Sequence, residues 1–226
     1  MKLRHEIKYF ITYGEYLVLM DKLFAAIPTD RNALPDMRGY HIRSLYFDDI
    51  NNSAMWEKQD GVQNRQKYRI RIYNLSDKVI HLENKMKFSQ MTAKASCTLS
   101  RELTDDILAG DWTRIPLGEN PVLDGFYAQM RAHVLRPVVI VDYFREAYTY
   151  PVGNVRITFD KELHTGNFSH DLFSGKAAPV PVLDPGMMIL EVKYDDILPS
   201  HIQGILNTAN AQRSAISKYG LCRRFH

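Results

Sequence analysis

The stretch that decides the fold is "RQKYRIRIY", residues 65–73, in which cations alternate with hydrophobic residues. Arg69 and Arg71 share one parity, whereas Ile70 and Ile72 occupy the other. Successive side chains of a strand point to opposite faces, so this segment predicts a strand with one cationic and one apolar face. In an ordinary half-buried sheet the cations would meet water and the isoleucines would line the core.

The bulk composition is that of a soluble globular protein, with 226 residues, 45% hydrophobic and 24% charged. Net charge is only +3, from 29 cations against 26 carboxylates, so an anion site must come from local sorting of charge. Cys97 and Cys222 fit no disulfide framework or zinc spacing. No run approaches the roughly 18 apolar residues of a membrane span. We expect a single domain over residues 1–226, cytoplasmic, with no membrane segment of its own.

Other segments of alternating polarity predict further strands, separated by helices. We expect strands at residues 2–11, 40–48, 65–73, 78–88, 92–99, 136–149, 154–160 and 187–194. We expect helices at 13–26, 52–58, 101–109, 121–134 and 200–222, the last of which could be broken, and a long loop at 164–186. This order predicts an α+β fold with a mostly antiparallel sheet, and eight strands are enough to close a β-barrel.

The one-sided charge pattern recurs along the chain. The cations on the charged parity are Arg4, Lys8, Lys67, Arg69, Arg71, Lys85, Lys87, Arg145, Arg156 and Lys193, and the carboxylates are Glu6, Glu83, Asp160 and Glu191. A solvated outer surface would mix the two signs more evenly. If the helices instead cover the apolar side, the charged side lines the lumen of a closed barrel. Such a lumen repels itself unless it holds a polyanion, which favours a phosphate chain.

The few carboxylates on this parity suggest a metal site. Mg²⁺ or Mn²⁺ needs one or two protein carboxylates and takes its other ligands from phosphate oxygens and water. Glu191, two residues before Lys193, is the first choice, and Glu6 is the second. For either residue the alternative is an internal ion pair with a neighbouring Arg or Lys.

Eight motifs come in the order "RHEIKY", "IRSLYFD", "KYRIRIY", "HLENKMK", "DYFREAY", "VRITFD", "ILEVKY" and "SAISKY". Together they resemble the VTC domain (vacuolar transporter chaperone, polyphosphate polymerase type) of the triphosphate tunnel metalloenzyme, or CYTH-like, superfamily. The resemblance spans residues 3 to about 220. It implies an eight-stranded antiparallel tunnel with helices packed outside. It also implies transfer of the γ-phosphate of ATP to a growing polyphosphate chain, with Mn²⁺ or Mg²⁺ as cofactor.

The resemblance also implies roles for individual residues. It assigns the basic phosphate ligands to Lys8, Arg69, Arg71, Lys85, Arg145 and Arg156. It assigns further tunnel-lining positions to Lys87, Lys94, Tyr143 and Lys193, and the metal carboxylate to Glu191. The motif "SAISKY" resembles the helix that brings Ser217 and Lys218 to one mouth of the tunnel. We expect Lys8 and Lys218 to bracket the transferring group, and pyrophosphate, triphosphate or polyphosphate to act as acceptor.

The chain departs from the hydrolase branch of that superfamily, which carries Glu-x-Glu-x-Lys at its start. Here the first of those positions is Arg4, which favours transfer or binding over hydrolysis and a single principal metal. We expect the domain to lack the SPX sensor and membrane helices of fungal complexes, so that coupling to transport would need a separate membrane partner.

Other functions stay open. They are a metal-dependent inorganic or nucleoside triphosphatase and a non-catalytic polyphosphate-binding module. Nucleic acid is not an expected partner, because the strands form no recognisable nucleic-acid-binding module.

Overall fold

The computed structural model describes residues 3–27, 39–166, 169–175, 178, 180–209 and 211–225. Its strands are β1 (Arg4–Thr12), β2 (Tyr40–Asp48), β3 (Asn64–Tyr73), β4 (Ser76–Phe88), β5 (Met91–Leu99), β6 (Arg136–Tyr150), β7 (Val155–Thr165), β8 (Val180–Pro181) and β9 (Met187–Tyr194). Its helices are α1 (Tyr13–Ala26), α2 (Ser53–Gln59), α3 (Arg101–Ala109), α4 (Pro121–His133), α5 (Ser200–Leu206) and α6 (Lys218–Arg223), with a 3₁₀ turn at Val152–Asn154.

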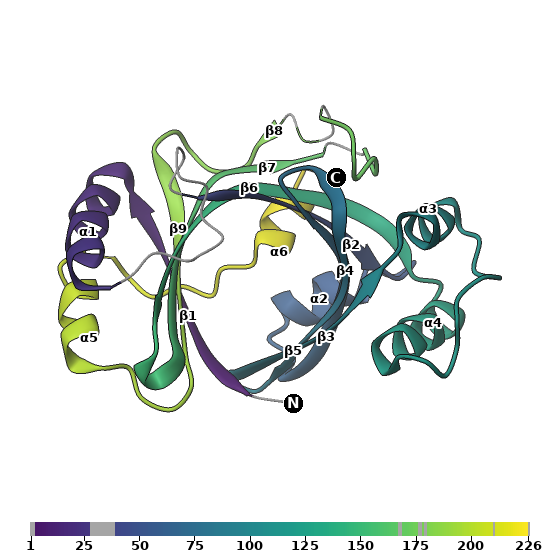
Figure 1. Ribbon diagram of the computed structural model, residues 1–226, viewed down its shortest axis with the longest axis horizontal. Coiled ribbons are helices and arrows are strands. Elements are labelled where there is room, and N and C mark those ends of the chain that lie inside the picture. The colour runs from purple at the N-terminus through teal and green to yellow at the C-terminus, as the bar shows by residue number, and fades with distance from the viewer. Residues whose placement is uncertain are drawn as a thin grey trace.

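The strands form one antiparallel sheet in the order β6-β2-β3-β4-β5-β1-β9-β7-β8. An additional pairing of β6 with β7 closes this sheet into a ring, and the short strand β8 pairs with β7 at the outside of the ring (Figure 1). The seams of the ring differ in length. β1 pairs with β9 from His5 to Thr12, whereas it pairs with β5 only at Arg4 and His5.

The predicted strands are confirmed, with small differences at their ends. β7 continues beyond residue 160 to Thr165, and in this part its register with β6 shifts at an irregularity where Glu162 adopts φ 53°. β8 lies in the predicted loop 164–186, part of which falls outside the described residues. The helix expected at 200–222 is two short helices, and between them Arg213 forms an isolated antiparallel bridge with Tyr9.

Capping residues explain where two helices begin. Thr12, the last residue of β1, accepts a hydrogen bond from the backbone of Glu15 at 3.3 Å, and the Glu15 carboxylate accepts one from the Thr12 backbone at 2.8 Å. This reciprocal pair starts α1 directly after the strand. The Ser100 side chain caps α3 by accepting a hydrogen bond from the Leu103 backbone at 3.1 Å. Across the described residues, none of the helices has both the length and the apolarity needed to span a bilayer.

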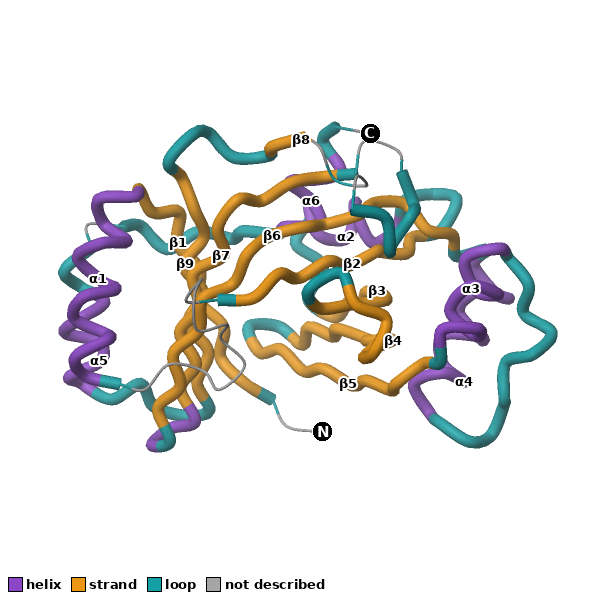
Figure 2. Tube along the Cα trace, turned by 45° about the horizontal axis from the view of Figure 1, so that its top comes forward, coloured by secondary structure: helices purple, strands orange, loops and turns teal. Residues whose placement is uncertain are grey.

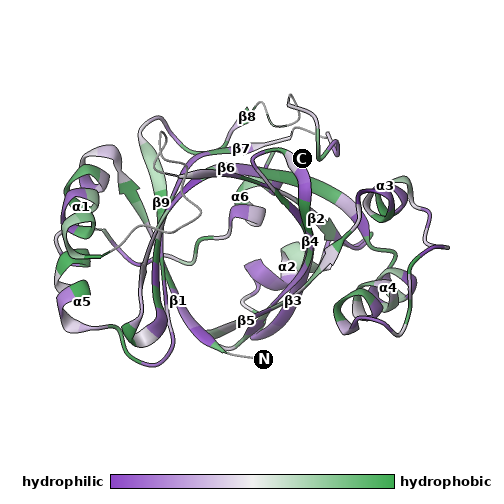
Figure 3. Ribbon diagram, viewed as in Figure 1, coloured by the Kyte–Doolittle hydropathy of each residue, from purple (hydrophilic) through white to green (hydrophobic). Residues whose placement is uncertain are grey.

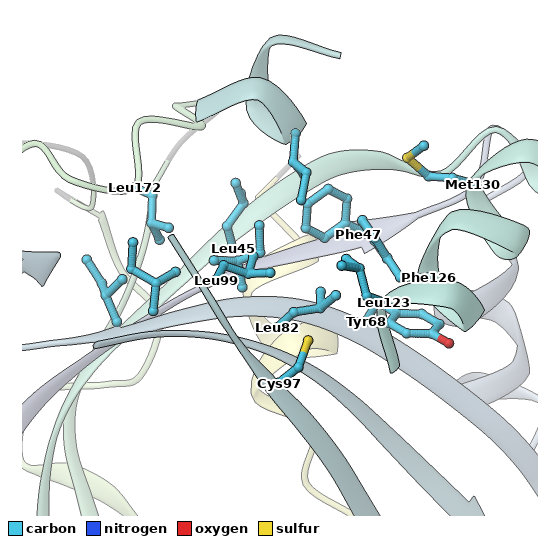
Figure 4. Packing of buried hydrophobic residues seen from close by; sticks show 14 of the residues in the cluster. Leu45, Phe47, Tyr68, Leu82, Cys97, Leu99, Leu123, Phe126, Met130 and Leu172 are labelled. Atoms are coloured by element: carbon cyan, nitrogen blue, oxygen red, sulfur yellow. The ribbon is translucent and has the colours of Figure 1, made fainter. Parts of the chain in front are cut away.

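The apolar parity of the strands faces outward, under the helices. Ile70 and Ile72 are fully buried in a cluster with Ile107 of α3 and with Leu123 and Phe126 of α4 (Figure 4). A second cluster packs the outer faces of β1, β7 and β9 against α1 and α5. Figure 3 shows hydrophobic and hydrophilic positions following one another along the strands of the ring. Arg69 and Arg71 of the opening stretch therefore point inward, and two of the apolar clusters lie outside the ring.

Helix α6 lies inside the ring, next to β6 and α2 (Figures 1 and 2). Its Tyr219 and Cys222 are buried against Val139 and Val141, which point inward from β6. This packing explains why β6 lacks a simple alternation of charged and apolar residues. Its inward parity is apolar where it meets α6 and polar further along, at Tyr143.

Candidate functional site

The interior of the ring, called the lumen below, holds two cavities of about 590 and 830 Å³. The two cavities share one set of lining residues, which we call the central group: Glu6, Arg69, Arg71, Lys85, Thr92, Arg145 and Lys193. These residues come from strands β1, β3, β4, β5, β6 and β9. The sheet closure therefore brings together charges that are far apart in the sequence.

Glu83 of β4 organises one side of the lumen. Its carboxylate is fully buried and accepts hydrogen bonds from Arg69 Nε at 2.7 Å and Lys94 Nζ at 2.6 Å. Arg71 lies farther away, with Nη1 at 3.8 Å from the same carboxylate. Burial would raise the pKa of Glu83, but these three cations hold it well below its usual range. Glu83 is thus a fixed anion that orients Arg69 in particular.

Arg71 is held by hydroxyl groups. Its Nε donates to Ser44 Oγ at 3.0 Å, and its Nη2 donates to the Tyr143 hydroxyl at 3.4 Å. Burial would raise the pKa of the Tyr143 phenol, but the surrounding cations, Arg145 first, lower it below its usual value. Because its hydrogen bonds go to neutral hydroxyl groups and Glu83 lies 3.8 Å away, more of the charge of Arg71 is left for a bound anion than in the case of Arg69.

Asp160 of β7 brings the inner helix and the sheet together. Its fully buried carboxylate accepts from Arg145 Nε at 2.6 Å and Nη2 at 2.7 Å. Lys218 of α6 forms an ion pair with Asp160 and lies 3.4 Å from Glu191. Burial would lower the pKa of Lys218, but the two carboxylates raise it above its usual value. Lys218 is only 8% exposed and lines the first cavity, and its expected place at a mouth of the tunnel stays a prediction.

Glu191 and Glu6 share two lysines. Glu191 lies 2.6 Å from Lys193 and 3.6 Å from Lys8, whereas Glu6 lies 3.6 Å and 3.7 Å from the same two amines. Lys85 completes the group with both oxygens of Glu6 at 2.9 Å. Burial and the nearby Glu191 favour the neutral form of Glu6, yet the lysines lower its pKa to about 2. The lysines likewise outweigh burial at Glu191, whose pKa is well below its usual range.

Both carboxylates therefore form the internal ion pairs that the sequence left as an alternative to metal binding. Their oxygen atoms also suit a hard divalent cation, because Mg²⁺ takes one or two carboxylates and completes its shell with phosphate and water. In the part of the chain that the structure describes, no three His, Cys, Asp or Glu side chains gather to hold a metal ion. The two carboxylates thus fit a cation whose remaining ligands come from a bound phosphate. Lys8 and Lys193 would then leave the carboxylates and bind the phosphate.

A model of the VTC domain matches residues 3–225 of this chain. The chain belongs to the VTC domain family. None of the curated proteins matches it significantly in sequence.

This VTC domain was compared with solved structures, of which one has a TM-score above 0.5. The chain is 8% identical to a candidate adenylate cyclase from Vibrio parahaemolyticus, with a TM-score of 0.52 and coverage of 96% of this chain and 97% of that one. It is 14% identical to a protein from Pyrococcus horikoshii, with a TM-score of 0.49 and coverage of 98% and 100%. A Mimivirus capping-enzyme triphosphatase aligns at 12% identity and a TM-score of 0.40, covering 92% and 88%. At these identities the likeness concerns the fold alone.

All the residues nominated from the sequence line one or both cavities of the VTC domain. The first cavity alone is lined by Lys8, Lys87, Tyr143, Glu191, Ser217 and Lys218, and the second alone by Lys94 and Arg156, while the rest belong to the central group. Lys8 donates to the Ile216 carbonyl at 3.2 Å, and Arg156 donates to the Tyr40 hydroxyl at 2.7 Å. The Ser217 hydroxyl accepts from the Gly220 backbone at 3.2 Å, so it caps α6. The chemical roles of these residues stay predictions.

Sequence reasoning missed several lining residues of the first cavity. Lys67 was counted among the cations of the charged parity but was not nominated as a site residue, and its amine is buried in the structure. Its parity, shared with Arg69, was the signal that could have found it. Lys58 of α2 and Arg213 carried no such signal, because neither lies on a strand.

Proposed function

We propose that this VTC domain is a metal-dependent phosphotransferase that moves the γ-phosphate of ATP onto a polyphosphate chain inside an eight-stranded tunnel. The observation that carries the proposal is the charge of the lumen. Its carboxylates are Glu6, Glu83, Asp160 and Glu191, and the cations paired with them are Lys8, Arg69, Arg71, Lys85, Lys94, Arg145, Lys193 and Lys218. Eight cations thus share four carboxylates in a largely buried space, which strongly favours a polyanionic ligand.

Positioning and neutralisation of charge supply most of the catalysis in phosphoryl transfer, so the reaction needs no protein nucleophile. A terminal phosphate oxygen of the acceptor chain attacks the γ-phosphorus of ATP. A new P–O–P bond forms, the bond between the γ-phosphorus and the β,γ-bridging oxygen breaks, and ADP leaves with that electron pair. Arg71 and Arg145 present planar guanidinium groups to the phosphate oxygens, which can bind them through two hydrogen bonds at once.

Glu191 and Glu6 would hold Mn²⁺ or Mg²⁺, which would neutralise negative charge of the phosphates when it is bound. The protein's own contribution is to free two lysines for this purpose. Lys8 and Lys193 bridge the two carboxylates in the described structure and would turn to the phosphate oxygens. Lys218 would keep its ion pairs with Asp160 and Glu191, and it lines the first cavity, where its ammonium group would lie near the transferred phosphate.

The test is incubation of the purified protein with ATP and Mn²⁺ or Mg²⁺, followed by gel analysis of polyphosphate and assay of orthophosphate. We expect chains that grow with time, and we expect their growth to be lost in Arg71→Met and Glu191→Gln. Arg101→Met is the matched control, because Arg101 is exposed on α3 and pairs with Asp105 outside the ring. Orthophosphate without polymer would instead assign a triphosphatase. Binding of polyphosphate without turnover would assign a non-catalytic module.

A further inference from the structure

Strand β5 leaves most of one edge without a neighbouring strand. From Met91 to Leu99 it pairs with β4 along its whole length. On its other edge, the ladder to β1 contains only Met91 and Thr92. In the part of the chain that the structure describes, no strand pairs with this edge between Ala93 and Leu99, which we call the free edge. Figure 2 shows β5 running along the margin of the ring.

The free edge lacks the features that protect edge strands from further pairing. Protected edge strands are short, or they are interrupted by a bulge, a proline or several charges. β5 has nine residues, contains no proline, and keeps one regular register with β4. Its one charged residue is Lys94, whose amine lies 2.6 Å from the carboxylate of Glu83 on β4. The free edge can therefore accept another strand.

The side chains beside the free edge form two different faces. Lys94, Ser96 and Thr98 share the parity that points towards the lumen, and all three are exposed. Cys97 and Leu99 have the opposite parity and are buried in the apolar cluster beneath α3 and α4. An added strand would thus meet polar groups on the lumen side and apolar surface on the outer side.

The lumen next to the free edge carries a large excess of positive charge. Lys94 belongs to the second cavity, whose described lining includes nine Arg and Lys side chains but a single carboxylate, that of Glu6. Carboxylates on the lumen side of an added strand would face this excess, whereas lysines would increase the repulsion. Apolar side chains suit the outer side, because they would extend the apolar cluster. The free edge therefore fits a strand in which acidic and apolar residues alternate.

We propose that the free edge of β5 binds an extended acidic segment of a partner protein, which adds a strand antiparallel to β5. The antiparallel direction continues the ladder that β1 begins where Arg4 pairs with Thr92. In this mode of binding, main-chain hydrogen bonds supply the affinity and alternate side chains supply the specificity. The stretch from Ala93 to Leu99 has the length of an ordinary strand. The proposal does not depend on the phosphotransferase reaction, because it concerns the wall of the ring.

The test measures, by fluorescence anisotropy, the binding of a fluorescein-labelled peptide to the full chain. The peptide has about eight residues, alternately valine and glutamate, which matches an ordinary strand. We expect saturable binding, and the same peptide with lysine in place of glutamate should bind at least about tenfold more weakly.

Methylation of the peptide's main-chain nitrogens tests whether a strand is added. In an antiparallel pair, alternate residues direct their N–H groups towards the same neighbour. Methylating the nitrogens of one parity should therefore weaken binding about tenfold or more, while methylating the other parity should change it by less than about twofold.

Thr98 allows a test from the side of the protein, because it is exposed at the free edge and lines neither cavity. Thr98→Glu should weaken binding of the valine–glutamate peptide about threefold to fivefold, and Thr98→Lys should strengthen it by a similar factor. Thr208→Glu is the matched control, because Thr208 is exposed just after α5, and it should leave the affinity unchanged.

Four outcomes would overturn the proposal. They are no binding of the valine–glutamate peptide, equal binding of the glutamate and lysine peptides, and equal effects of the two methylation patterns, which would mean that the peptide binds only as a polyanion in the lumen. The fourth is a dimer of the full chain, seen by light scattering, that dissociates in Thr98→Glu, because a second copy would then occupy the free edge. The assay with ATP tests the proposed function separately.

Discussion

Arg145 and Asp160 face each other across the seam between β6 and β7, where the guanidinium donates to both carboxylate oxygens at 2.6 and 2.7 Å. This is the seam that closes the ring. Lys218 of α6 binds the same carboxylate, so one buried anion joins two strands and the inner helix. One buried side chain thus contributes both to the seam that closes the ring and to the placement of the inner helix.

Replacing Asp160 by Asn should reduce the free energy of unfolding by about 3–5 kcal/mol, because it leaves two buried cations without their main partner. Urea unfolding followed by circular dichroism measures the change. Asp77→Asn is the control, since Asp77 pairs with Arg101 at the exposed surface and its loss should stay within about 1 kcal/mol. Equal stability of the two variants would mean that Asp160 does not hold the seam.

Substitutions of Arg69 and Arg71 should have different effects on stability and on ligand binding. Arg69→Met leaves the buried Glu83 without its closest cation and should cost about 3 kcal/mol of unfolding free energy. Arg71→Met removes hydrogen bonds to hydroxyl groups and should cost about 1 kcal/mol. Triphosphate affinity should nevertheless fall about tenfold to a hundredfold in Arg71→Met. Calorimetry and urea unfolding on the same two proteins check both statements, and a reversed order of stabilities would contradict them.

Much of this site follows from parity in the sequence. Arg69 and Arg71 alternate with Ile70 and Ile72, and the shortage of carboxylates on the charged parity indicates which face turns inward. The position of α6 did not follow, because its packing on Val139 and Val141 joins residues that are far apart in the chain. The expectation that Lys218 lies at a mouth of the tunnel came from the resemblance of "SAISKY" to the VTC domain. Its burial depends on Asp160 and Glu191, which reach it from two other strands.

Stability should fall in acid through Glu6. Its pKa in the folded protein is about 2, below the ordinary value of 4.5, so its contribution is complete above about pH 4.5 and is lost as the pH falls towards 2. Glu6→Gln should show a shallower decline of unfolding free energy over this range. Glu119→Gln, in an exposed position between α3 and α4, should keep the slope of the parent. A Glu6→Gln slope equal to that of the parent would show that the lysines do not hold Glu6 ionised.

Glu191→Gln should abolish the dependence of activity on metal without weakening phosphate binding. Without divalent cations, the variant should bind triphosphate at least as tightly as the parent, because Lys8 and Lys193 lose a competing anion. Its turnover with ATP should no longer respond to Mn²⁺ or Mg²⁺. Calorimetry in the presence of a chelator and a metal titration of activity measure the two effects. A variant that keeps the full response to metal would exclude Glu191 as a ligand.

The short ladder between β1 and β5 has a consequence for how the ring fluctuates. Only Arg4 and His5 of β1 pair with β5, so the neighbouring backbone of both strands gains little from this seam. Local opening has its lowest free energy where hydrogen bonds are fewest. Amide hydrogens flanking this seam should therefore exchange with solvent faster than those along β6 and β7. Lys85 and Lys94 pair in register across the adjoining β4–β5 ladder, and both line the second cavity. Opening of the β1–β5 seam would therefore let solvent reach the lumen through its wall.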